Sequence, residues 1–180
     1  MKKIMILLAF TAMFAFQGCE GPEGPEGPPG QDGLIAEVFE LKNVNFLHDN
    51  SASNNTGYTI YQKLNPVLYS GDVLLVYRLS DVTSSGAPVW QQIPRTLFLA
   101  QGELDYDFDF SKEDFTIYAG GTYNLTLTPG YLNGQTFRIV IVPGDDGTTA
   151  KKSVNKPDYS NYYEVIKKYN IDDSNVVKLN

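Results

Sequence analysis

Residues 103–110 alternate strictly between acidic and apolar side chains, and this stretch constrains the fold more than any other. The acidic positions are Glu103, Asp105, Asp107 and Asp109, and the apolar positions are Leu104, Tyr106, Phe108 and Phe110. Successive side chains of a β-strand point to opposite faces of its sheet, so the pattern predicts a strand with one buried and one solvated face. The chain must therefore build a sheet that covers an apolar core.

A second stretch, 72–79, is apolar at both sets of alternating positions, which is typical of a strand inside a sheet. Residues 137–141 indicate another strand. Its expected partner is 123–127, because the connection contains the turn dipeptides Pro129-Gly130 and Asn133-Gly134. Further strands are predicted at 35–46, 58–64, 89–99 and 114–118.

Seven or eight short strands separated by Gly, Pro, Asn and Asp favour an all-β fold, an antiparallel β-sandwich. We expect it to be only loosely immunoglobulin-like, because no Cys-Trp-Cys pattern is present. Residues 34–180 suit one domain in length. One short helix is predicted after Pro157-Asp158, because Tyr162, Val165, Ile166 and Tyr169 follow helical spacing. We expect the helix to pack on a sheet; partner binding is the alternative.

The first eighteen residues have the pattern of a secretory signal. Lys2 and Lys3 precede an apolar run over 4–16 that reaches Cys19 after Gln17 and Gly18. A helix of that length spans about 20 Å, whereas the bilayer core is about 30 Å thick. We therefore expect 1–18 to be a signal peptide that is removed, and no membrane-spanning anchor.

Residues 16–19, Phe-Gln-Gly-Cys, resemble the lipobox of bacterial lipoproteins, in which a small residue precedes a cysteine that is acylated on sulfur. The resemblance implies that Cys19 is the lipid-attachment site and the new N-terminus. Two or three acyl chains anchor a protein lastingly, whereas one holds it only marginally. The alternative is an ordinary signal followed by a free cysteine.

Residues 21–33 read GPEGPEGPPGQDG, which is four Gly-X-Y triplets closed by a glycine. This is collagen composition, because only glycine fits at the axis of a triple helix. Two interpretations remain open: a single-stranded, semi-rigid spacer over 19–33, or a short triple helix in a homotrimer. The acidic residues Glu23, Glu26 and Asp32 oppose the trimer by like-charge repulsion.

Composition excludes several chemistries. One cysteine and one histidine cannot form an internal disulfide or supply a zinc site. The formal net charge of -7 argues against nucleic acid as a partner. The uniform triplet glycines do not match a dinucleotide-binding loop, so we expect no cofactor.

The candidate chemical residues all have a structural alternative that we prefer. The ladder Asp105, Asp107 and Asp109 could bind a cation, but its spacing favours a solvated face. Asp145-Asp146-Gly147 is typical of a polar turn. His48 stands beside Asp49 with Ser51 and Ser53 downstream, but a nucleophile needs a base that the fold places, and a histidine followed by an aspartate is common by chance. We therefore assign no catalytic residue and no metal ligand, and expect no enzyme; a carboxylate-based hydrolase is the weakest alternative.

Tyrosines cluster at 158–163, with the sequence DYSNYY. Tyrosine clusters form sugar-stacking or protein-binding surfaces, although aromatic residues more often lie in the core. We prefer the core interpretation and keep the surface patch as the alternative.

The lipobox-like site, the Gly-Pro-Glu triplets and the β-rich domain together resemble the collagen-like lipoproteins of Gram-negative bacteria. The stretches 71–78, 106–110 and 137–143 carry the resemblance into the folded part. It implies an envelope protein anchored in the outer membrane through Cys19, on its periplasmic or exterior side. We expect a non-enzymatic protein that presents its sandwich to a protein or glycan partner, with a structural trimer as the alternative.

Overall fold

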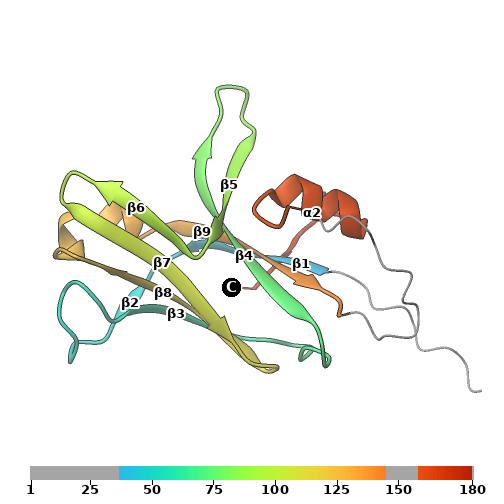
Figure 1. Ribbon diagram of the computed structural model, residues 1–180, viewed down its shortest axis with the longest axis horizontal. Helices are drawn as coiled ribbons and strands as arrows, with labels where there is room; N and C mark the ends of the chain where they lie inside the picture. Colours follow the sequence, from blue (N-terminus) through green and yellow to red (C-terminus); the bar gives the residue numbers. More distant parts are fainter. Residues whose placement is uncertain (1–36, 145–157, 180) are drawn as a thin grey trace, which may run out of the picture. The chain divides into compact units, whose positions relative to one another are not determined.

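The computed structural model describes residues 37–144 and 158–179. Two five-stranded sheets make up this part, sheet A in the order β10-β1-β9-β4-β5 and sheet B in the order β2-β3-β8-β7-β6. The sheets stack as two layers (Figure 1). Neighbouring strands are antiparallel except β1 and β10, which are parallel. The predicted all-β sandwich with one short C-terminal helix is confirmed.

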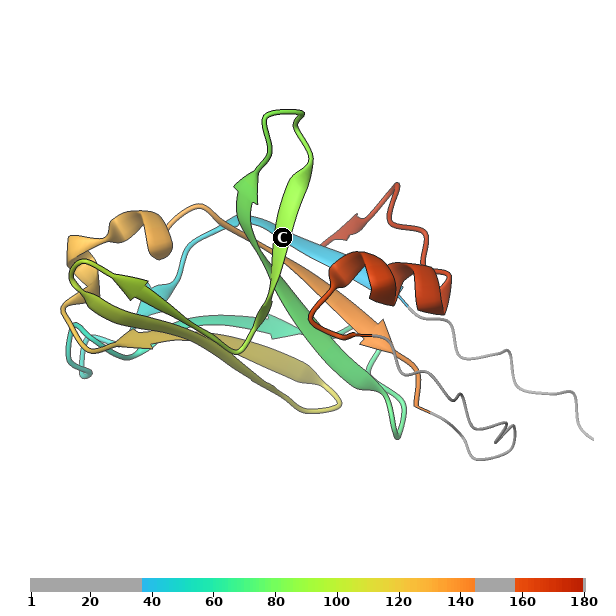
Figure 2. The same ribbon diagram turned by 45° about the horizontal axis from the view of Figure 1, so that its top comes forward.

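Sheet A contains β1 (Glu37–Val44), β4 (Val73–Val82), β5 (Pro88–Ile93), β9 (Gln135–Val142) and β10 (Val177–Lys178). Sheet B contains β2 (Leu47–His48), β3 (Tyr58–Lys63), β6 (Arg95–Leu99), β7 (Gly102–Phe110) and β8 (Asp114–Gly121). Tight turns join β4 to β5 and β7 to β8, and the β4–β5 hairpin extends beyond its neighbours (Figure 2).

The main core lies between the sheets. It is built from alternate residues of nearly every strand, including Leu41, Val76, Tyr106, Ile117 and Phe137. Each of these side chains is at most 2% exposed. Burying one such apolar side chain stabilises the fold by about 1.5–3 kcal/mol, so this layer is the main favourable contribution.

Strand β4 is apolar on both faces, as its sequence predicts. Leu74 and Val76 point into the main core, while Leu75 and Tyr77 point to the opposite face of sheet A. A second apolar layer covers that outer face. It contains Val38, Leu75, Tyr77, Val140, Val142, Tyr162, Val165 and Ile171.

Helix α2 (Tyr162–Tyr169) supplies the cover of this second layer. Asn161 caps its N-terminus, because its side chain accepts hydrogen bonds from the backbone N–H groups of Tyr163 and Glu164. Asn170, in the left-handed conformation with φ of 52°, ends it. Tyr162 and Val165 are buried, so the predicted packing of the helix on a sheet is confirmed.

The stretch 89–99, predicted as one strand, is two strands in different sheets. Strand β5 pairs with β4 in sheet A, and β6 pairs with β7 in sheet B. Pro94 separates them, and a proline has no N–H group to donate to either ladder. The chain therefore crosses from one layer to the other at this residue.

The strand predicted at 123–127 is wrong. Residues Leu125–Leu127 form a 3-10 helix, η1, and Pro129–Tyr131 form a second, η2. The side chain of Asn124 accepts a hydrogen bond from the backbone N–H of Thr126 at 3.0 Å and starts η1. Leu125 is buried but Leu127 is 65% exposed, so the apparent alternation does not correspond to a sheet face. Strand β9 pairs instead with β1 and β4.

Candidate functional site

The two outer faces of the sandwich differ in what covers them. Helix α2 covers the outer face of sheet A. On sheet B, large side chains that point away from the core stay exposed: Phe98 is 80% exposed, Tyr61 61% and Tyr118 37%. We refer to the acidic and aromatic side chains that β3, β6, β7 and β8 direct outward as the acidic–aromatic face, namely Tyr61, Phe98, Glu103, Asp105, Asp107, Asp109, Asp114 and Tyr118.

Strand β7 produces this face by the alternation seen in its sequence. Leu104 and Tyr106 are almost fully buried, whereas Glu103, Asp107 and Asp109 are exposed. The predicted alternation and the exposure of Asp107 and Asp109 are therefore confirmed, whereas Asp105 is half-buried and its Oδ1 accepts a hydrogen bond from the Thr96 hydroxyl. Phe110 departs from the pattern: it is 42% exposed, although its partner on β8, Phe115, is buried in the main core.

Register places an exposed ring directly opposite two of the β7 carboxylates. Glu103 is the partner of Phe98 on β6, and Asp107 is the partner of Tyr118 on β8. Side chains at directly opposed positions have Cβ atoms about 4.5–5.5 Å apart. The face thus repeats one local unit, a carboxylate beside a ring.

Tyrosine hydroxyls on this face donate to neighbouring carboxylates. Tyr118 donates to Asp109 Oδ2 at 2.9 Å, and Tyr61 donates to Asp114 Oδ2 at 3.2 Å. These hydrogen bonds are the main cause of a raised pKa at both phenols. Both tyrosines therefore stay neutral donors, and each carboxylate keeps lone pairs for further donors.

The charge of the face is unbalanced. Five of its members are carboxylates, and Lys63, opposite Asp114, is the one basic side chain that the described strands of sheet B direct outward. No group of three His, Cys, Asp or Glu side chains among the residues described could hold a metal ion. Successive β7 carboxylates are about 6.6 Å apart at the backbone, as a strand requires.

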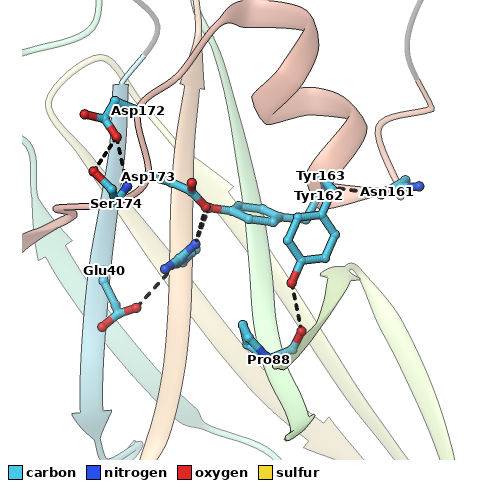
Figure 3. Close-up of polar contacts among 9 residues, drawn as sticks. Glu40, Pro88, Asn161, Tyr162, Tyr163, Asp172, Asp173 and Ser174 are labelled. Carbon is cyan, nitrogen blue, oxygen red and sulfur yellow. Dashed lines mark hydrogen bonds and ion pairs between the residues drawn. The ribbon is translucent and has the colours of Figure 1, made fainter. Parts of the chain in front are cut away.

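The outer face of sheet A contains a polar network centred on Arg138, whose partners Glu40, Tyr162 and Asp173 are labelled in Figure 3. Its Nε lies 3.4 Å from Glu40 Oε2, and its Nη1 donates to Asp173 Oδ2 at 2.8 Å and to the Tyr162 hydroxyl. The same hydroxyl donates to Asp173 Oδ2 at 2.8 Å. The guanidinium carbon lies 4.7 Å from the Trp90 ring centre and 5.1 Å from that of Tyr162.

Opposing effects act on the pKa of Arg138. Burial acts to lower it, whereas Tyr162 and the carboxylates of Asp173 and Glu40 act to raise it, and the pKa is raised overall. Burial and the hydrogen bond to Asp173 also raise the pKa of Tyr162. Arg138 therefore stays a cation, and its contacts link α2, the segment after α2 and β1 to strand β9.

Two tyrosines of the cluster at 158–163, for which core packing was predicted and a surface patch was the alternative, are divided between core and surface. Tyr162 is buried in the second apolar layer, which confirms the core interpretation for it. Tyr163 is 54% exposed and donates to the Pro88 carbonyl at 3.0 Å (Figure 3). The hydrogen bond from Tyr163 therefore connects α2 to β5. Trp90 Nε1, beside it, is the only buried side-chain nitrogen or oxygen without a hydrogen-bond partner in the described ranges.

A buried arginine was missed by the sequence analysis. Arg78 is 8% exposed on the inner face of β4, where Nε donates to Gln135 Oε1 at 2.8 Å. Its guanidinium carbon lies 4.8 Å from the Tyr106 ring centre and 5.7 Å from that of Tyr131. Gln135 in turn donates to the Gly130 carbonyl at 2.7 Å. The signal was available, since Arg78 occupies a core position of the β4 alternation.

The other candidates from the sequence are not brought together. His48 Nε2 lies 3.3 Å from the Ser53 carbonyl, and its ring packs 4.4 Å from that of Tyr58. Asp49 accepts from Ser51, which lowers the pKa of the Asp49 carboxyl. Asp49 thus forms a local turn. Asp145, Cys19 and the triplets over 21–33 lie outside the described residues.

No helix in the described ranges has the length and apolar character needed to cross a bilayer. Comparison with known proteins gives no match to any family model, any curated protein or any solved structure.

Proposed function

We propose that this chain is a lipid-anchored protein of a bacterial cell envelope that presents its β-sandwich to a macromolecular or glycan partner and catalyses no reaction. The partner contacts the acidic–aromatic face. The N-terminal segment supplies the anchor and the spacer.

One observation supports the binding role above the others. Helix α2 and its apolar layer cover one outer face of the sandwich, whereas the other outer face exposes rings on three strands, from Tyr61, Phe98 and Tyr118. Exposed aromatic residues are enriched where proteins bind partners, because they offer a large contact area at a low cost in conformational entropy. Because α2 covers the outer face of sheet A and the outer face of sheet B is exposed, we expect the partner to bind on the sheet B side.

The sequence supports the anchor. The only cysteine, Cys19, follows a basic and apolar leader, and the chain has no basic residue between Lys3 and Lys42. Twelve residues of collagen-like composition span about 37 Å when extended. Acidic residues in this stretch are repelled by an anionic membrane within about 8 Å. The spacer therefore keeps the domain away from the lipid surface.

Site-specific photocrosslinking tests the binding role. The full chain is expressed in a Gram-negative host with a photoreactive side chain at Tyr61, at Tyr118 or at Val82, the last a control that is 51% exposed on the β4–β5 hairpin. We expect discrete adducts from positions 61 and 118 and none from 82. Equal adducts at all three positions, or none at all, would contradict the proposal.

The four Gly-X-Y triplets favour a second candidate, a structural trimer held by a short triple helix. Light scattering on the full chain in nonionic detergent distinguishes the two. A monomer at every protein concentration would exclude the trimer, and a concentration-dependent trimer would support it.

A further inference from the structure

We propose that the acidic–aromatic face binds an extended polypeptide segment with basic side chains four residues apart. This inference rests on the proposed function and names the chemistry of the partner. Each basic side chain pairs with a carboxylate of β7 and lies against the ring opposite that carboxylate.

The negative charge of the acidic–aromatic face favours a positively charged partner. Five carboxylates share the face with Lys63 as the one outward basic group of the described sheet B strands. A second copy of the same face would bring like charges together, and phosphates or acidic glycans would also be repelled. A lysine or arginine segment has the complementary charge.

The rings add a second requirement that charge alone does not explain. Phe98 stands opposite Glu103, and Tyr118 stands opposite Asp107. A lysine or arginine side chain can pair with a carboxylate through its charged end and cover an aromatic ring with its apolar stem. Each pair of residues therefore matches both parts of one basic side chain.

The distance between the two pairs fixes the spacing in the partner. Glu103 and Asp107 are separated by four residues of β7, which is about 13 Å along a strand. A partner segment that is also extended covers the same length in four residues. Basic residues at positions i and i+4 of such a segment meet both pairs, whereas adjacent basic residues meet only one.

Binding of synthetic peptides to the full chain in a nonionic detergent tests this geometry. Fluorescence anisotropy compares a threonine peptide with lysines at i and i+4, a peptide of identical composition with adjacent lysines, and a neutral oligosaccharide. We expect the spaced peptide to bind at least about fivefold more tightly than the adjacent one, because it forms two pairs rather than one. Binding should weaken as salt rises from about 10 to about 150 mM.

Matched variants assign the binding to the face. Glu103→Gln with Asp107→Asn should weaken binding of the spaced peptide about tenfold. The control, Glu37→Gln with Asp81→Asn, removes the same charge from sheet A and should change binding about twofold or less. Phe98→Ala with Tyr118→Ala keeps the charge and should weaken binding about fivefold. Urea unfolding of each variant verifies that it is folded.

Several results would overturn the inference: equal affinity for the two peptides, equal losses in the face variant and the control, binding of the oligosaccharide alone, or no binding. The photocrosslinks separate this failure from failure of the proposed function. Adducts from positions 61 and 118 without peptide selectivity would leave the binding role in place with a partner of another class.

Discussion

At the scale of single residues, two arginines on adjacent strands show how sheet A accommodates charge. Arg138 on β9 points outward and pairs with Glu40 and Asp173. Arg78 on β4 points inward and is enclosed by Tyr106, Tyr131 and Gln135. A buried charge is costly unless it is hydrogen-bonded or paired. Arg138 is paired with two carboxylates, whereas Arg78 is hydrogen-bonded to a glutamine and lies against two tyrosine rings.

Removing the charge of Arg138 should destabilise the fold. Arg138→Met leaves the carboxylates of Glu40 and Asp173 close together without their cation, and we expect a loss of about 2–3 kcal/mol in the free energy of unfolding. Urea denaturation measures it. Arg95→Met, at an exposed position of β6, is the matched control and should cost about 0.5 kcal/mol or less. Equal effects of the two substitutions would show that the network contributes little.

Buried tyrosines predict a loss of stability at alkaline pH. Burial raises the pKa of Tyr77 above the ordinary value of 10.0, and burial together with the hydrogen bond between the Tyr159 and Tyr169 hydroxyls raises the pKa of Tyr169 to about 12. The unfolded chain therefore releases protons first as pH rises. The stabilisation is complete below pH 10 and is lost progressively above it.

Urea denaturation between about pH 8 and about pH 11.5 tests this dependence. Tyr77→Phe removes one raised pKa and the 2.6 Å hydrogen bond to the Tyr159 carbonyl. We expect it to lower stability at pH 8 by about 1 kcal/mol and to make the alkaline decline less steep. Tyr69→Phe, at a position 68% exposed, should alter neither. An unchanged decline in Tyr77→Phe would contradict the assignment.

At the scale of elements, α2 completes the fold by covering the outer face of sheet A. The helix is eight residues long, and a helix this short is unstable alone in water. Its stability therefore depends on the Asn161 cap and on the burial of Tyr162 and Val165.

A substitution under the helix should weaken this cover. Val165→Ala removes apolar volume at a position with no exposed surface, and we expect a loss of about 2 kcal/mol in unfolding free energy. Lys167→Ala, on the exposed side of the same helix, should change stability by about 0.5 kcal/mol or less. Comparable losses in both variants would mean that the packing of α2 is not the cause.

Sequence patterns predicted those elements whose burial is regular. The alternation at 103–110 predicted β7 and its solvated acids, and the spacing of Tyr162 and Val165 predicted the packed helix. The pattern failed at 123–127, because the cap formed by Asn124 favours a tight helical turn over a strand. It also missed the change of sheet at Pro94, because 89–99 was predicted as one strand although a proline has no N–H group to donate to a strand ladder.

The candidate site was predicted only in part. The sequence indicated that Asp105, Asp107 and Asp109 share a solvated face. It did not indicate that Phe98 and Tyr118 stand opposite Glu103 and Asp107, because cross-strand register depends on pairing between distant segments. The exposure of this face likewise depends on where α2 packs, which is a property of the whole sandwich.

For the whole molecule, we propose three parts: an anchor, a spacer and a binding domain. The anchor is proposed at Cys19, the spacer at the Gly-X-Y triplets over 21–33, and the binding surface on sheet B. Anchoring through one end holds many copies at the same membrane. Tethering also raises the effective concentration of the face toward partners in the same envelope.

Mass spectrometry of the N-terminal peptide from membrane-extracted protein tests the proposed lipid anchor. We expect a chain that begins at Cys19 with acyl groups on that residue, and a Cys19→Ser variant that no longer partitions with membranes. A free thiol at Cys19 in the membrane-extracted protein, or a chain that retains Met1, would contradict it.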